Sequence, residues 1–195
     1  MPFQNRCAPD GTLHATPARG ALMGNRGGRL HRADGTLGAS RWRSRAWICC
    51  LTTFRGRRRA VMGAGYTEIF FLDEPTALAA GHRPCFECRR AAALAFAAAW
   101  GRAKGTPPPR VSEMDRALHA ERLGPREILA FSTIPAGVIF EADGFQLRTV
   151  AGARRWSFEG YGPERAFAAG DRLSCLTPPS IVAALRAGYA PHVSL

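Results

Sequence analysis

Short apolar runs separated by turn residues alternate with alanine-rich stretches along this chain. The aromatic, β-branched and apolar run at residues 47–54 predicts a buried strand, and residues 67–72 predict a second one. An Asp-Glu-Pro triplet begins at residue 73, which suits the start of a helix because acids and proline favour its first turn. That helix is expected to stop at Gly81. The first half of the chain therefore contains a predicted strand–helix unit.

The second half begins after a strong helix-breaking segment. Residues 89–103 predict an alanine-rich helix that ends before Gly105-Thr-Pro-Pro-Pro109. Residues 111–123 predict another helix, and residues 134–150 alternate strand and turn patterns. A strand and a proline-led helix close the chain.

These elements predict an α+β protein in which a small zinc-stabilised strand–helix module precedes a second, β-rich lobe. The first 45 residues are rich in glycine, arginine and turn residues and show neither helical nor strand periodicity. The expected parts are a basic Gly/Arg-rich arm at residues 1–39, the zinc module at residues 40–104 and an α+β C-terminal lobe at residues 111–195.

The formal net charge of +12 is concentrated near the N-terminus. Residues 1–62 hold 12 arginines and only two acids, whereas the rest of the chain is nearly balanced. Codon preference can explain arginine in place of lysine, but it does not explain missing acids. A positive field of this kind attracts polyanions such as nucleic acid. The candidate phosphate contacts are Arg26, Arg29, Arg55, Arg57, Arg58 and Arg59.

The cysteine pattern predicts a metal site. Cys85 and Cys88 form a C-x-x-C turn between a proline and a long helix. Such a turn supplies two thiolates to a tetrahedral zinc ion, and amides at a helix start favour the thiolate form. The alternatives are ordinary buried thiols and a redox pair, and no βαβ pattern of the thioredoxin type surrounds the motif to support the redox pair.

The other zinc ligands are expected from elsewhere in the chain. Cys49 and Cys50 are the first choice because a strand at residues 47–54 can lie beside the turn. Adjacent strand residues point to opposite faces, so one of them is expected to bind the metal and the other to pack. The competitors for the fourth position are His31, His82 and Cys7.

A local resemblance to a known family adds to this picture. The segment Phe70-Phe-Leu-Asp-Glu-Pro-Thr-Ala-Leu-Ala-Ala-Gly-His-Arg-Pro-Cys-Phe-Glu-Cys-Arg89 resembles the zinc-binding domain of the Ada-type DNA alkylation-repair proteins. Similar small zinc modules occur in some nucleases. The resemblance covers about a tenth of the chain and implies a structural zinc ion and contact with nucleic acid.

The chain departs from that family in two places. The family's other two ligands form a C-x-x-x-C pair shortly before the matching strand, and one of them accepts the methyl group. Here Arg55-Gly-Arg-Arg-Arg59 occupies that region, with the vicinal cysteines slightly upstream. A downstream helix-turn-helix and an alkyltransferase Pro-Cys-His motif are also missing. The resemblance therefore extends to zinc binding rather than to methyl transfer.

A second kind of site is possible on the helix at residues 111–123. Asp115, His119 and Arg122 are spaced i, i+4 and i+7, so they share one face. Asp115 and His119 could serve acid–base or divalent-metal catalysis in a hydrolase. An exposed helix that carries charged pairs at i, i+4 has the same pattern.

The apolar run at residues 46–51 is far shorter than the roughly 20 residues that cross a bilayer. The N-terminus lacks the pattern of a signal peptide, so a soluble, cytoplasmic protein without membrane contact is expected. The leading hypothesis is a zinc-containing nucleic-acid-binding protein linked to DNA repair or processing, with DNA preferred over RNA. The alternatives are a hydrolase or nuclease that uses Asp115 and His119, and a partner-binding adaptor.

Overall fold

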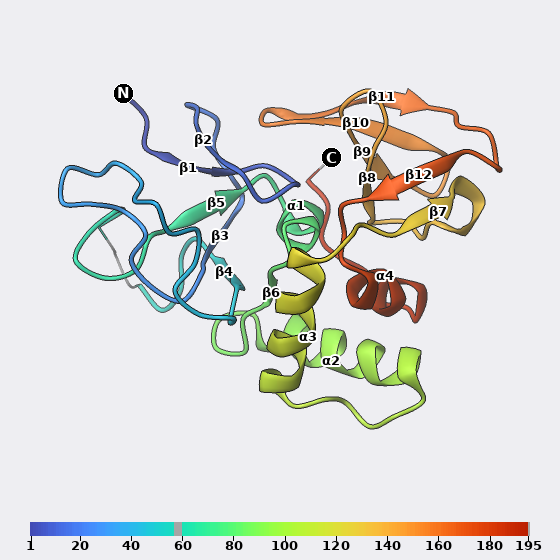
Figure 1. Cartoon of the computed structure of the whole chain (residues 1–195), viewed down its shortest axis with the longest axis horizontal. Helices are drawn as coiled ribbons and strands as arrows, with labels where there is room; N and C mark the ends of the chain where they lie inside the picture. The colour runs from blue at the N-terminus through green and yellow to red at the C-terminus, as the bar shows by residue number, and fades with distance from the viewer. Residues whose placement is uncertain (57–59, 195) are drawn as a thin grey trace.

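The computed structural model describes residues 1–56 and 60–194. Within these residues the chain forms two six-stranded sheets and four α-helices (Figure 1). This mixture confirms the predicted α+β class. Each sheet is built from one half of the chain, and the helices lie between and below the sheets in the view of Figure 1.

The first sheet collects short strands from residues 4–84. In spatial order it contains β2 (Leu13–Ala15), β1 (Gln4–Cys7), β5 (Ile69–Phe71), β3 (Leu22–Asn25), β4 (Ile48–Leu51) and β6 (Arg83–Pro84). The β1–β5 and β4–β6 pairs are parallel and the others are antiparallel.

The prediction that residues 1–39 form a basic arm is wrong, because these residues supply β1, β2 and β3 of the first sheet. Strands of three or four residues are too short to display an alternating pattern, and β3 is buried along its whole length. β3 also contains a glycine and an asparagine, which are depleted in strands, so its composition does not predict a strand.

The second sheet is antiparallel throughout. In spatial order it contains β11 (Gly160–Arg165), β10 (Ala153–Ser157), β9 (Phe145–Arg148), β8 (Ile139–Glu141), β12 (Arg172–Cys175) and β7 (Ile128–Ala130). A single 3-10 turn, η1 (Phe131–Thr133), follows β7 within the described residues.

The helices begin and end close to where their capping residues predict. They are α1 (Glu74–Ala79), α2 (Arg90–Lys104), α3 (Val111–Leu123) and α4 (Pro179–Arg186). The Asp73 side chain caps α1 by accepting a hydrogen bond from the Thr76 amide at 3.1 Å. Gly105 ends α2 in the left-handed conformation, with φ of 62°, which glycine adopts without strain.

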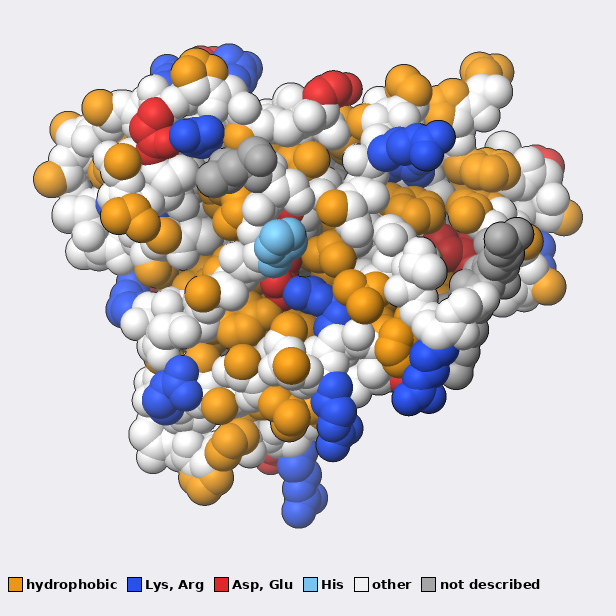
Figure 2. Space-filling model, turned by 180° about the vertical axis from the view of Figure 1, so that it is seen from behind, with side chains coloured by type: hydrophobic (Ala, Val, Ile, Leu, Met, Phe, Trp, Pro, Cys, Tyr) orange, Lys and Arg blue, Asp and Glu red, His pale blue; other side chains and the backbone are white. Residues whose placement is uncertain are grey.

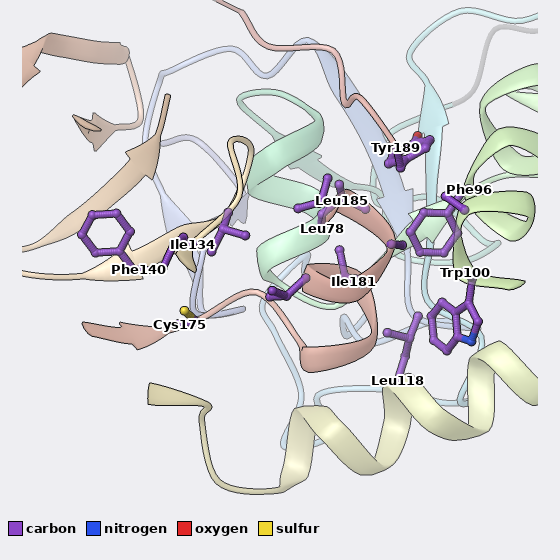
Figure 3. Close-up of a cluster of buried hydrophobic side chains, with 14 of the residues drawn as sticks. Leu78, Phe96, Trp100, Leu118, Ile134, Phe140, Cys175, Ile181, Leu185 and Tyr189 are labelled. Carbon is purple, nitrogen blue, oxygen red and sulfur yellow. The ribbon is translucent and has the colours of Figure 1, made fainter. Parts of the chain in front are cut away.

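Helix α1 lies at the centre of the molecule, between the two sheets (Figure 1), and all six of its residues are buried. Ala77 packs into the core of the first sheet, and Ala79 packs with Ile139 and Trp156 of the second sheet. Leu78 joins the largest cluster, which α2, α3 and α4 line (Figure 3).

The largest cluster takes residues from both sides of the 105–109 breaker. Phe96 and Trp100 of α2 pack with Leu118 of α3 and with Ile181 of α4 (Figure 3). The breaker thus separates two helices, but their apolar faces share one interior.

Polar contacts also join α1 to the second half of the chain. Asp73 accepts a hydrogen bond from the Tyr161 hydroxyl at 2.9 Å, and the Trp156 indole donates to the Thr76 hydroxyl at 3.0 Å. Burial raises the pKa of Asp73, and hydrogen bonds from Thr76, Tyr161 and Ser194 partly offset this rise. The helix is therefore held by buried hydrogen bonds as well as by packing.

Among the described residues, no helix combines the length and the apolar character that crossing a membrane requires.

Candidate metal centre

Three cysteines from separate parts of the chain meet beside the first sheet. Their Sγ atoms all lie within 4.8 Å of one another: Cys50 is on β4, Cys85 follows β6, and Cys88 lies just before α2. The parallel pairing of β4 with β6 brings them together, because the Cys85 amide donates to the Cys49 carbonyl at 2.9 Å. The C-x-x-C turn is thereby placed next to Cys50.

Backbone amides donate to two of these sulfurs. The Glu87 amide lies 3.4 Å from Cys85 Sγ, and the Leu51 amide lies 3.4 Å from Cys88 Sγ. A hydrogen bond from Cys50, together with such amides, lowers the pKa of Cys85 to about 5. The same bond, with burial, raises the pKa of Cys50. This arrangement favours the thiolate form of Cys85 over that of its two neighbours.

The geometry and chemistry of the three sulfurs fit a soft cation. A tetrahedral zinc ion with Zn–S bonds of about 2.3 Å places its sulfurs roughly 3.8 Å apart. Sγ atoms within 4.8 Å need only small side-chain rotations to reach that separation. Thiolates favour zinc over hard cations such as magnesium or calcium.

The cluster opens onto a cavity of about 220 Å³. Asn25, Tyr66, Glu68 and Phe70 line this cavity together with the three cysteines. In the described part of the chain, no fourth cysteine, histidine or carboxylate belongs to the cluster. Three protein ligands and one side that faces a cavity resemble a metal site with an exchangeable fourth position more than a closed structural site.

Cys49 lies outside the cluster, on the opposite face of β4. It is fully buried with Ile69 and Phe71, and Arg89 Nη1 donates to its sulfur at 3.4 Å. Burial raises the pKa of its thiol to about 12. Cys49 is therefore not a ligand. Of the two adjacent cysteines, the alternation of the strand points only Cys50 at the turn.

The three competitors for the fourth position have other partners. His31 Nδ1 lies 2.7 Å from the Thr67 hydroxyl, and His31 Nε2 lies 3.0 Å from the Gly63 carbonyl. His82 is completely buried in the core, where burial holds its pKa well below the usual value. Cys7 accepts a hydrogen bond from Arg26. None of the three belongs to the cluster.

The proposed catalytic face of α3 is divided between different contacts. Both oxygens of Asp115 accept from Arg83, at 2.7 and 2.9 Å, because that buried guanidinium requires a counter-ion. His119 packs edge-on against Trp42 with ring centroids 5.7 Å apart, and its Nδ1 is 3.4 Å from Arg122. The structure thus gives Asp115 a structural partner and does not join it to His119 as an acid–base pair.

The arginines that were predicted to contact phosphates differ in their exposure to solvent. Arg26 is only 2% exposed, so its predicted contact with the backbone of a bound strand is wrong. Its guanidinium lies over the Trp47 ring, 4.0 Å from the centroid, and donates to the Gly11 carbonyl at 2.7 Å. Arg29 and Arg55 are exposed. Arg57, Arg58 and Arg59 lie outside the described residues. On the face shown in Figure 2, Lys and Arg side chains lie in separate groups.

Sequence reasoning missed the carboxylate and the phenol that line the cavity beside the three cysteines. Glu68 precedes β5, is 4% exposed and accepts from the Met62 amide at 2.8 Å. Tyr66 lies two residues earlier and also faces the cavity. The only hint was their position between the vicinal cysteines and the C-x-x-C turn.

Comparison of the chain with protein-family models, with curated proteins and with solved structures found no match.

Proposed function

We propose that Cys50, Cys85 and Cys88 bind a zinc ion and that the protein is a zinc-containing nucleic-acid-binding protein. The observation that carries the metal assignment is the approach of three Sγ atoms to within 4.8 Å of one another. Three thiolates from one tight turn and a neighbouring strand are the donors that zinc prefers. The open side of the ion faces the cavity beside Glu68.

The nucleic-acid part of the proposal rests on charge and on the segment between β4 and β5. The chain has a net charge of +12, and this segment carries the exposed Arg55, whose guanidinium lies 5.0 Å from the centroid of the Phe54 ring. Phe54 and Tyr66 of the same segment line the metal cavity. A polyanion bound to this segment would lie beside the open position of the ion, and the resemblance to Ada-type domains favours DNA over RNA.

The metal assignment predicts a difference between two neighbouring cysteines. Protein purified without chelator should contain about one zinc ion per chain, measured by inductively coupled plasma mass spectrometry. Cys50→Ser should lose the metal because it removes one of three thiolates. Cys49→Ser should retain it, because that sulfur faces the core.

Cys88→His separates the loss of a ligand from the loss of folding. Imidazole can replace a thiolate as a zinc donor, so this variant should retain the metal. Equal metal content in the Cys50→Ser and Cys49→Ser variants would contradict the assignment, and so would wild-type protein that carries no metal.

Nucleic-acid binding should depend steeply on salt. If about four phosphates are neutralised, the affinity for a short DNA duplex should fall roughly 100-fold between about 50 and 200 mM salt. Arg55→Ala should weaken binding and flatten this slope, whereas Arg116→Ala, which removes an exposed charge on α3, serves as the control. Fluorescence anisotropy measures both. Absence of DNA and RNA binding, or an affinity independent of salt, would overturn this part of the proposal.

A further inference from the structure

A second cavity, of about 510 Å³, lies where the two halves of the chain meet. Its wall is formed by the β1–β2 turn, the segment before β4, the C-terminal end of α3 and the residues before α4. It shares no lining residue with the cavity at the cysteines within the described structure. Its volume falls within the range of sites that take small organic ligands.

Two arginines from different halves of the chain line this cavity and contact the same aromatic ring. Arg26 Cζ lies 4.0 Å and Arg122 Cζ lies 4.1 Å from the centroid of the Trp47 ring. Arg122 donates to the carbonyls of Gly81 and Arg45, at 2.7 and 3.0 Å. Both guanidinium groups are thus held rigidly by the ring and by carbonyl oxygens.

Neither arginine has an anionic partner in the described part of the chain. Arg122 Nε is buried and has no hydrogen-bond partner there. Burial, together with the neighbouring Arg26, lowers the pKa of Arg122 to about 10. Two desolvated cations close together are costly unless an anion supplies the opposite charge.

The acids on the cavity wall do not supply that charge directly. Asp10 accepts from the Thr12 amide and hydroxyl within its own turn, at 2.9 and 2.7 Å. Glu121 accepts from the Ser180 amide at 3.1 Å and from the Ser180 hydroxyl. Arg41 and Arg126 also line the cavity, and Arg126 already pairs with Glu141 at 2.6 Å, so three of the four arginines on its wall have no ion pair within the described residues.

An aromatic surface lies beside the cationic wall. Trp42 lines the cavity, is 37% exposed, and is held edge-on by His119 at a centroid distance of 5.7 Å. An exposed indole held in place offers a planar surface on which a heterocyclic base can stack. A cation pair that lacks an anion and an available indole together match a ligand with both a phosphate and a base.

We propose that this cavity binds a nucleotide, with its phosphate at Arg122, beside the buried charge of Arg26, and its base against Trp42. The ligand is either a free mononucleotide or the phosphorylated end of a nucleic-acid strand, since both present the same chemistry. The site is independent of the three-cysteine centre.

Isothermal titration calorimetry of the full chain with adenosine 5′-monophosphate tests this site. Wild-type protein should bind one molecule per chain, and Arg122→Gln should weaken binding about tenfold to 100-fold, because a charged hydrogen-bond donor is lost. Trp42→Leu should bind adenosine 5′-monophosphate only as weakly as inorganic phosphate. Arg116→Gln removes an exposed charge from the same helix outside the cavity and should change the affinity by about twofold at most.

Competition with single-stranded DNA distinguishes the two sources. Displacement by a 5′-phosphorylated oligonucleotide but not by its 5′-hydroxyl counterpart would assign the site to strand ends, and displacement by neither would assign it to free mononucleotides. Cys50→Ser should retain binding, which separates this site from the metal centre. Absence of binding at about 1 mM nucleotide, or equal losses in Arg122→Gln and Arg116→Gln, would overturn the proposal.

Discussion

Cys85→Ser is expected to lower the melting temperature of the chain by roughly 8–16 °C. A ligand present at about a thousand times its dissociation constant stabilises the folded state by about 4 kcal/mol, and zinc held by three thiolates readily reaches that regime. For a chain of this length, each kcal/mol corresponds to about 2–4 °C. The loss should be large because the proposed ion would join β4 to the turn before α2.

Differential scanning calorimetry with and without a zinc chelator separates this effect from ordinary packing. The chelator should lower the melting temperature of the wild type and of Cys49→Ser, and leave Cys85→Ser unchanged. Cys49→Ser also loses core packing, so only its response to chelator is compared. Equal responses of all three proteins would show that the ion does not stabilise this fold through Cys85.

Glu74→Gln is expected to cost about 3–5 kcal/mol of stability, because it leaves a buried cation without its partner. Arg89 Nη2 lies 2.7 Å from Glu74 Oε2, and the two side chains are 9% and 2% exposed. The same carboxylate accepts from the Tyr189 hydroxyl and, at 3.0 Å, from the His192 amide. Glutamine keeps the shape but removes the charge that the Arg89 guanidinium requires.

The control for this substitution is an ion pair of equal length at the surface. Arg154 and Glu164 are also 2.7 Å apart, but each side chain is about one third exposed. Glu164→Gln should therefore cost far less than Glu74→Gln, since water already solvates both charges. Urea denaturation at neutral pH measures both variants. Similar small losses in the two variants would mean that Arg89 finds another partner when Glu74 is neutral.

The helices and the C-x-x-C turn could be predicted because their determinants are local. Asp73 caps the helix that begins at the next residue by accepting from the Thr76 amide, and Gly105 ends a helix through its own backbone conformation. The strands of residues 4–25 could not be predicted, because their partner lies far along the chain. Arg6 on β1 pairs with Phe70 on β5, and the Asn5 side chain donates to the Glu68 carbonyl.

The site was predictable to the extent that strand geometry determines it. Alternation along β4 implies that one vicinal cysteine faces the turn, but the choice of Cys50 depends on the register of β4 with β6. The role of Arg26 was not predictable, because residue type indicates a solvated charge while the Trp47 ring, 21 residues away, buries it. The structural role of Asp115 was not predictable for a similar reason, since its partner Arg83 belongs to another element.

The central position of α1 has a consequence for the order of events during synthesis. Its carboxylates, Asp73 and Glu74, have their donors at Tyr161, Tyr189 and His192, more than 80 residues later. While the ribosome is still producing those residues, these hydrogen bonds are missing and the side of α1 that packs on the second sheet is uncovered. The first sheet can pair as soon as residue 84 is available, but α1 is covered on its other side only after residue 192 has emerged, which leaves an apolar surface open to chaperones in the meantime.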